Sequence, residues 1–219
     1  MNRNEKYVIT INREMGSGGR TVGRQLSERL GVQFYDKALI NALKEKYHLS
    51  VEEIEKLKGQ SHSWWSEFRR LFSFDNPSDI YSWAMAPSLP AEDALTRVAP
   101  LTSKEMFNAE TEILKGIAET ESCVVAGRSG FYVFRDHPNH LSILIQASMP
   151  FRLQRVMRKQ QIGEAEARKI IEKIDKMREN YVKEYTGTSR YDTRNYDLVV
   201  SADGKTEEQI VDLIMAYIG

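Results

Sequence analysis

The stretch that decides the fold is YVITINREMGSGGRTVGRQL, residues 7–26. It places an apolar run before three glycines and an arginine–threonine pair after them. Glycine loses more backbone entropy on folding than any other residue, so three glycines in four positions indicate a loop that bends sharply or approaches something closely. A strand, a glycine-rich turn and a helix in this order are typical of phosphate binding, because amide N–H groups and the positive helix end point into the turn.

This glycine-rich loop partly matches the phosphate-binding pattern G-x-x-x-x-G-K-[ST]. Glu14 stands at the first glycine position, Gly19 at the second and Arg20 at the lysine position. Thr21 has the hydroxyl group that can ligate a magnesium ion bridging two phosphates. The predicted phosphate-binding residues are Gly16, Ser17, Gly18, Gly19, Arg20 and Thr21. The alternative is a plain strand–helix turn with a solvated Arg20, whereas the dinucleotide pattern G-x-G-x-x-G does not fit.

Short apolar runs predict the strands of the sheet. The runs lack strict alternation and are bounded by Gly, Asp or Asn, which suits a parallel sheet that is covered on both faces. The predicted strands are 7–11, 33–35, 123–126, 142–146 and 197–200. Because helical patterns fall between them, we expect right-handed crossovers and a three-layer α/β domain.

The helices are predicted from the spacing of apolar residues and from capping signals. The predicted helices cover 21–30, 36–47, a long stretch through 170–185, and segments that begin after Ser50, Thr102 and Thr206. In the long helix, the packed face is expected to be the stripe of Ile170, Ile174, Met177, Tyr181 and Tyr185. Its charged residues are expected to face solvent.

One segment, 59–101, breaks this alternation. It contains all three tryptophans, Trp64, Trp65 and Trp83, and four of the six prolines. Two interpretations remain open: an insertion that covers or shapes a site, or a flap that only packs on the core. We therefore predict a single domain over 1–219 with an insertion at about 48–105.

Charge and composition exclude some classes of partner. Lys+Arg and Asp+Glu each number 31, so the formal net charge is zero. A dominant attraction to nucleic acid or to an anionic membrane is therefore not expected. The N-terminal residues show no apolar leader, and we predict a cytoplasmic protein. The sequence gives no prediction of the oligomeric state.

Four separated stretches together carry a family resemblance. They are GSGGRT at 16–21, FYDKALI at 34–40, VVAGRSG at 124–130, and DKMRENYVKEYTG at 175–187 with YDLVVSADGKTEEQIVDLI at 196–214. In order and spacing the chain resembles the cytidylate kinase-like family, in the nucleoside monophosphate kinase branch of P-loop kinases. The resemblance implies a three-layer α/β, P-loop NTPase-like fold with a central parallel sheet of about five strands. It also implies a helical lid at about 150–190 and an acceptor-side insertion.

The resemblance further implies a reaction and a set of site residues. The reaction is transfer of the γ-phosphoryl group from ATP, with Mg²⁺, to a small acceptor such as CMP or dCMP. The implied catalytic residues are Arg20, Arg128, Arg155, Arg158, Asp175 and Arg178. The implied acceptor-binding residues are Asp36, Arg128, Asp175 and Arg178, and the metal ligands are Thr21 and Asp36. The alternatives are that Asp36 caps a helix and that the lid arginines are solvated surface residues.

Three positions depart from the family pattern. Arg20 replaces a lysine, Ser129 stands where cytidylate kinases have an aspartate, and Ala42 stands where they have an arginine. These departures keep a second hypothesis open, a regulatory or sensor protein that binds nucleotide but turns over slowly or not at all. A third hypothesis is a module that binds a phosphate or sulfate ligand for another chemistry.

Overall fold

The computed structural model describes residues 1–36, 40 and 103–219 and divides the chain into two compact units. The first unit comprises Met1–Phe34 and Ser122–Gly219, and the second comprises Tyr35–Glu121. The described part of the second unit includes helix α6 (Ser103–Thr120). The predicted helix at 36–47 lies almost wholly outside the described residues, and the helix after Ser50 and the three tryptophans of the insertion lie outside them altogether.

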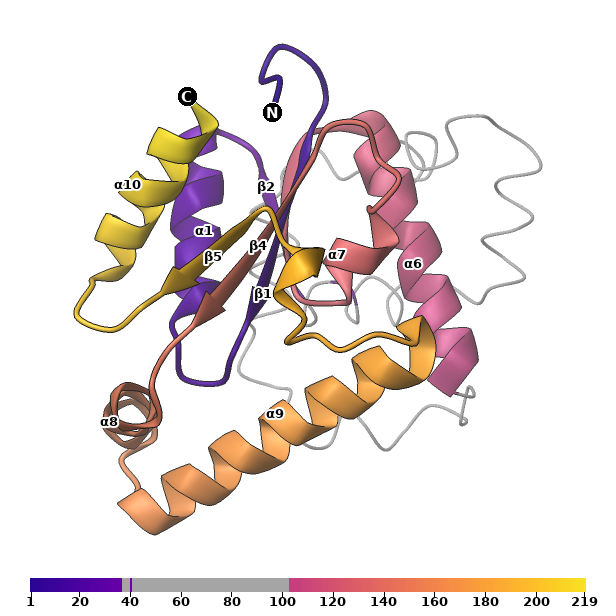
Figure 1. Cartoon of the computed structure of the whole chain (residues 1–219). Coiled ribbons are helices and arrows are strands. Elements are labelled where there is room, and N and C mark those ends of the chain that lie inside the picture. The colour runs from indigo at the N-terminus through magenta and orange to yellow at the C-terminus, as the bar shows by residue number, and fades with distance from the viewer. Residues whose placement is uncertain (37–39, 41–102) are drawn as a thin grey trace, which may run out of the picture. The chain divides into compact units, whose positions relative to one another are not determined.

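A five-stranded sheet has the order β2-β3-β1-β4-β5 (Figure 1). The strands are β1 (Val8–Arg13), β2 (Gln33–Asp36), β3 (Cys123–Ala126), β4 (His140–Gln146) and β5 (Leu198–Ser201). β1 pairs in parallel with β3 and β4, and β4 pairs in parallel with β5. The α/β class and the parallel sheet of five strands are therefore confirmed.

Helices cover the sheet and extend beyond it. In the first unit they are α1 (Gly19–Leu30), α7 (Gly130–Val133), α8 (Met149–Gln160), α9 (Glu164–Thr186), the 3₁₀-helix η2 (Thr193–Asn195) and α10 (Glu207–Ile218). α1 and α10 pack side by side (Figure 1). The capping box predicted at Thr206 forms with Gln209. Among the described residues, no helix is long and apolar enough to cross a membrane.

The central strand β1 places the glycine-rich loop at one edge of the sheet. Its residues Val8, Ile9 and Ile11 are fully buried. Ile11 pairs with Ala126 of β3, and Arg13 pairs with Ile145 of β4. Because parallel strands end at the same edge, the segments that follow β1, β3 and β4 meet there, where open α/β sheets bind ligands.

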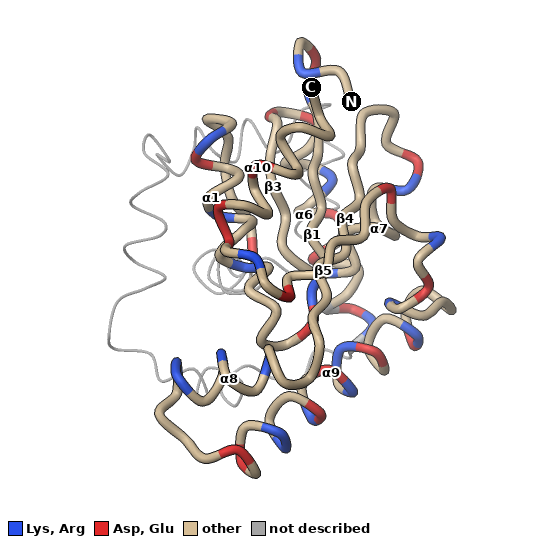
Figure 2. Tube along the Cα trace, turned by 60° about the vertical axis from the view of Figure 1, so that its left-hand side comes forward, with Lys and Arg blue, Asp and Glu red and all other residues tan. Residues whose placement is uncertain are grey.

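The long helix α9 corrects one expectation. Its buried residues are Ala167, Ile171, Asp175 and Val182, whereas Met177 of the expected stripe is 59% exposed. The packed face is thus shifted by about one residue, because Asp175 turns inward toward polar partners and apolar spacing alone does not detect such a residue. Basic and acidic residues follow one another along the rest of the helix (Figure 2).

Candidate phosphate-binding site

The backbone of the glycine-rich loop adopts conformations that suit glycine. Gly16 and Gly18 have φ of +87° and +88°, in the left-handed region that side chains disfavour. At Gly19 the constraint is space, because a Cβ there would lie 2.5 Å from the Cβ of Arg13. The chain therefore turns from β1 into α1 in a way that these glycines permit.

The hydrogen bonds within the loop determine which amides can bind a ligand. The Ser17 amide and hydroxyl donate to the Glu14 carbonyl at 3.3 and 3.0 Å, and the Thr21 amide donates to the Gly18 carbonyl at 2.9 Å. Within the described part of the chain, the amides of Gly16, Gly18 and Gly19 have no hydrogen-bond partner. Three such amides beside the N-terminus of a twelve-residue helix form a suitable anion site.

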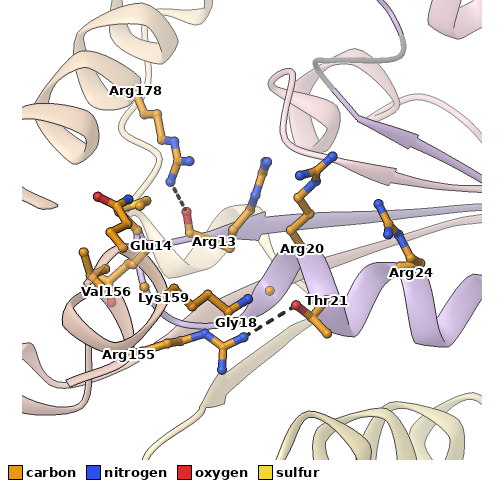
Figure 3. Close-up of a pocket in the computed structure, with 14 residues that line it drawn as sticks. Arg13, Glu14, Gly18, Arg20, Thr21, Arg24, Arg155, Val156, Lys159 and Arg178 are labelled. Atoms are coloured by element: carbon orange, nitrogen blue, oxygen red, sulfur yellow. Dashed lines mark hydrogen bonds between the residues drawn. The ribbon is translucent and has the colours of Figure 1, made fainter. Parts of the chain in front are cut away.

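The loop opens on a cavity of about 360 Å³ (Figure 3). Its lining includes six basic residues: Arg13, Arg20, Arg24, Arg155, Lys159 and Arg178. Figure 3 shows that Arg13 and Arg20 extend in the same direction, from the end of β1 and the first turn of α1. Among the described lining residues, Glu14 is the one acid, and its carboxylate already accepts a 2.9 Å hydrogen bond from the Ala147 amide. The cavity thus suits a ligand with several negative charges.

Arg155 of α8 reaches directly into the loop. A Cβ at Gly18 would lie 3.3 Å from its guanidinium carbon. Its Nη2 lies 3.5 Å from the Thr21 hydroxyl (Figure 3) and also forms an ion pair with the Glu207 carboxylate. Burial raises the pKa of Glu207, but its own backbone amide and Arg155 bring the pKa below its ordinary value overall. The Glu207 carboxylate of α10 therefore holds the Arg155 guanidinium of α8 over the loop.

Asp175 is the centre of a second charged cluster, behind the loop. It is 7% exposed and accepts a 2.9 Å hydrogen bond from the Met15 amide. Its carboxylate lies 2.5 Å from Arg152, 3.6 Å from Arg178 and 3.7 Å from Arg190.

The arginines of this cluster also contact the end of β1. The Arg178 guanidinium donates to the Arg13 carbonyl at 3.3 Å (Figure 3), and Arg190 donates to the same oxygen. Burial lowers the pKa of Arg178, Arg190 lowers it further, and Asp175 opposes both effects. Asp175 and its arginines therefore fix α9 against the entrance of the loop.

The turn after β3 adjoins this edge of the sheet. Gly127, Arg128 and Ser129 all have positive φ, of 82°, 58° and 53°. Arg128 donates a 3.1 Å hydrogen bond to the Tyr181 hydroxyl on α9 and lies 5.2 Å from the centre of its ring. Burial lowers the pKa of Arg128. Two non-glycine residues in the left-handed region are a form of strain that is common at functional sites.

The structure places the predicted site residues unequally. The cavity is lined by the predicted residues Gly16, Gly18, Gly19, Arg20, Thr21, Arg155 and Arg178. Ser17 is buried within the loop, and Asp175 lies behind it. Arg158 is exposed and does not line the cavity. Asp36 belongs to the second unit, so its part in the site stays a prediction.

Sequence reasoning missed several residues of the site. They are Arg13, Arg24, Arg152, Arg190 and Glu207. Arg13 had a usable signal, since it is the last residue of a buried strand directly before the glycines. Glu207 and Arg190 had none, because they lie about 190 and 170 residues along the chain from the loop that they support.

The residues that line the cavity do not fit a resident magnesium site. Mg²⁺ takes oxygen ligands, usually including one or two carboxylates. The Thr21 hydroxyl lies beside the Arg155 guanidinium, and Glu14 is engaged elsewhere. Among the described residues, no group of three or more His, Cys, Asp or Glu could hold a metal ion. A magnesium ion that arrives with phosphates would be held mainly by phosphate oxygens and water.

Comparison with known proteins supplies the family. A sequence model of the cytidylate kinase-like family matches residues 8–203, which span the glycine-rich loop, α8, α9 and β5. The chain belongs to this family. The family match therefore confirms the resemblance inferred from four short stretches. No curated relative matched the sequence.

Solved structures resemble this cytidylate kinase-like chain to different degrees, and the first of the following three shares its fold. An uncharacterized protein from Eubacterium ventriosum ATCC 27560 has a TM-score of 0.63 at 22% identity, covering 97% of this chain and 98% of that one. A shikimate kinase from Bacteroides thetaiotaomicron has a TM-score of 0.49 at 15% identity, covering 97% and 98%. A gluconokinase from Sinorhizobium meliloti 1021 has a TM-score of 0.46 at 14% identity, covering 97% and 92%.

Proposed function

We propose that this cytidylate kinase-like protein transfers the γ-phosphoryl group of ATP to a small acceptor, most simply a nucleoside monophosphate such as CMP or dCMP. Family membership supports phosphoryl transfer as the general reaction. The observation that carries the proposal is the loop itself, whose Gly16, Gly18 and Gly19 amides lack partners among the described residues, beside a cavity with six basic residues. Phosphoryl transfer depends mainly on positioning and on charge neutralisation, which such a site supplies.

Each group at the site has a proposed role. The three glycine amides bind phosphate oxygens, and Arg20 acts in place of the customary lysine. Arg155 and Arg178, which reach the loop from α8 and α9, neutralise charge that develops on the transferred group. ATP supplies the phosphoryl group and the negative charge, which these residues balance together with any Mg²⁺ that the phosphates bring.

The acceptor side is proposed from fewer observations. Arg128 lies in the strained turn after β3 and contacts Tyr181 of the lid helix. We assign it to the acceptor together with Arg178. Asp175 orients Arg178 at 3.6 Å rather than facing the cavity, and the role of Asp36 rests on the resemblance.

A second candidate is a nucleotide-binding regulatory or sensor protein that turns over slowly or not at all. Arg20 at the lysine position favours it. So does Arg155, because its ion pair with Glu207 over Gly18 restrains a group that catalysis would use.

The two candidates are separated by a turnover assay. The full chain is incubated with Mg-ATP and CMP, dCMP, UMP or AMP, and ADP formation is followed. We expect turnover with one acceptor, and at least about a hundredfold less in Arg20→Ala, the usual scale for a charge-stabilising group. Arg168→Ala is the matched control, since Arg168 is exposed on α9 and pairs only with Glu164 among the described residues. ATP binding without turnover across the panel would favour the sensor.

We also propose the organisation that the sequence predicted. The chain forms a single P-loop kinase-like domain with an acceptor-side insertion at about 48–105 and a lid at about 150–190, in the cytoplasm. Its partners are the nucleotide and a small acceptor rather than nucleic acid or a membrane. The helices α8 and α9 support the lid assignment, because they pack on each other and bring Arg155 and Arg178 to the loop.

A further inference from the structure

The position beside the Thr21 hydroxyl is already taken by a positive group. The Arg155 Nη2 lies 3.5 Å from this hydroxyl, and the guanidinium lies against Gly18. The Arg155 side chain is 11% exposed, so it is held in the loop rather than solvated. This is the place where a phosphate-binding loop of this kind would present its hydroxyl to a magnesium ion.

The ion pair with Glu207 explains how Arg155 is kept there. Glu207 lies in the first turn of α10, and its carboxylate bonds to the same Nη2 that faces Thr21. The lowered pKa of Glu207 keeps this carboxylate ionised at neutral pH. A guanidinium restrained in this way can donate further N–H groups to phosphate without losing its carboxylate partner, since it has five donors in a planar fork.

A divalent cation at the same hydroxyl would be repelled by this guanidinium. The repulsion acts at short range in a partly buried site, where solvent screens poorly, and the Glu207 carboxylate paired with the same Nη2 reduces it. The described lining offers no carboxylate to compensate, because Glu14 bonds to the Ala147 amide and lies 3.8 Å from Arg152. Lys159, another lining residue, adds a further positive charge.

From this arrangement we infer that Arg155, and not a divalent cation, is the positive group at Thr21, so that ATP binds in the loop without Mg²⁺. The inference rests on the proposed function, since it takes ATP as the ligand of the loop. It adds that Glu207 is a positioning residue that acts on the nucleotide only through Arg155.

The test is equilibrium binding of ATP to the full chain, by calorimetry, in excess Mg²⁺ and in EDTA. We expect dissociation constants within about threefold of each other, because the guanidinium supplies the charge that the metal would add. Tight binding that appears only with Mg²⁺ would overturn the inference and leave the proposed function standing. Binding in neither condition would overturn both.

Variants test the assignment to Arg155. Arg155→Gln should weaken metal-free binding about tenfold or more, the scale of a lost charged hydrogen bond, and Mg²⁺ should then restore part of the affinity. Arg155→Lys keeps the charge and should lose much less, which also tests the role if the glutamine variant fails to fold. Metal-free binding that is unchanged in Arg155→Gln would overturn the inference.

A double-mutant cycle tests Glu207. Glu207→Gln should weaken metal-free binding about threefold in the native background and should have no effect in Arg155→Gln. Glu208→Gln is the matched control, since Glu208 is the next residue and its side chain is 77% exposed. An equal effect of Glu207→Gln in both backgrounds would show that it does not act through Arg155.

Discussion

Two strand-to-helix turns lie at the same edge of the sheet and both contain left-handed backbone conformations. They differ in the residues that adopt these conformations. The turn after β1 places its left-handed conformations at Gly16 and Gly18, where no side chain opposes them. The turn after β3 places one at Gly127 but continues with Arg128 and Ser129. Such a conformation costs a non-glycine residue about 1–3 kcal/mol. The first turn is thus built to expose its backbone, and the second to hold particular side chains.

Their surroundings differ in the same sense. The first turn is fixed from outside by charges, because Asp175 binds the Met15 amide and gathers three arginines. The second turn is supported by packing, since a Cβ at Gly130 would lie 2.7 Å from the methyl group of Thr10. In this protein the backbone anion site has charged residues behind it, whereas the turn that presents a side chain packs closely against β1.

The largest effect is expected from Asp175→Asn, which removes the charge that supports the first turn. The fully buried Arg190 would lose its ion pair with Asp175, whereas Arg152 would keep, among the described residues, its ion pair with Glu14 at 3.8 Å. Breaking a buried ion pair costs about 3–5 kcal/mol. Chemical denaturation should show a loss of this size in the free energy of unfolding. A loss below about 1 kcal/mol would mean that the charges do not support the loop.

The next effect concerns the backbone of the first turn. In Gly16→Ala the Cβ would lie 2.9 Å from the Arg152 carbonyl oxygen at φ +87°. We expect a loss of about 2–4 kcal/mol in the free energy of unfolding, from the left-handed conformation and the contact together. Gly31→Ala is the matched control, because φ is +67° there and nothing lies within 4 Å of the Cβ. It should lose only about 1–2 kcal/mol. Equal losses in the two variants would show that the close approach of the Gly16→Ala Cβ to Arg152 does not contribute.

Low pH should reduce the stability contributed by His140, which contacts the Thr10 side chain beneath the second turn. The His140 Nε2 lies 2.8 Å from the Thr10 hydroxyl, and burial lowers the pKa of His140 to about 4, with His137 lowering it and Asp197 opposing. Since the unfolded histidine titrates near 6.5, the unfolded state takes up a proton first as the pH falls. The stability that neutral His140 contributes is therefore fully present above about pH 6.5 and declines toward pH 4. The free energy of unfolding should fall by about 2 kcal/mol between pH 8 and pH 5.

Denaturation of the native chain and of His140→Gln over this pH range measures the pH-dependent stability that His140 contributes. The difference in stability between the two proteins should shrink as the pH falls. A difference that stays constant with pH would show that His140 takes up its proton equally in both states.

The smallest effect on stability is expected from Arg128→Gly in the second turn. The change relieves a φ of 58° but removes the hydrogen bond to Tyr181. These contributions oppose each other, so the free energy of unfolding should change by less than about 1 kcal/mol. Turnover, by contrast, should fall at least about tenfold if Arg128 contacts the acceptor. A stability loss above about 2 kcal/mol with full turnover would make Arg128 a structural residue.

The same contrast explains what the sequence could predict. The five strands, α1 and the cap at Thr206 depend on residues close together in the chain, so their patterns were sufficient. The glycine-rich loop was found for the same reason. The strained turn was not predicted, because the tripeptide Gly-Arg-Ser does not indicate that Arg128 and Ser129 adopt positive φ.

The supports of the site could not be read from the sequence because they are long-range. Glu207 holds Arg155 from a helix about 50 residues later, and Arg190 reaches back to the end of β1. The packed face of α9 was placed one residue away for a related reason. Apolar spacing identified Met177, whereas a buried carboxylate, Asp175, determines which side turns inward. Charged residues that face the interior break the rule on which that prediction relied.

The central claim is that the amides of the first turn bind phosphate, and amide NMR of the ¹⁵N-labelled chain tests it most directly. ATP should shift the amide signals of Gly16, Gly18 and Gly19 in a saturable way, with downfield proton shifts typical of new hydrogen bonds to phosphate. The signals of Gly31 and Gly204, which lie outside the cavity lining, should stay in place. Saturable ATP binding that leaves the three loop amides unshifted would contradict the account.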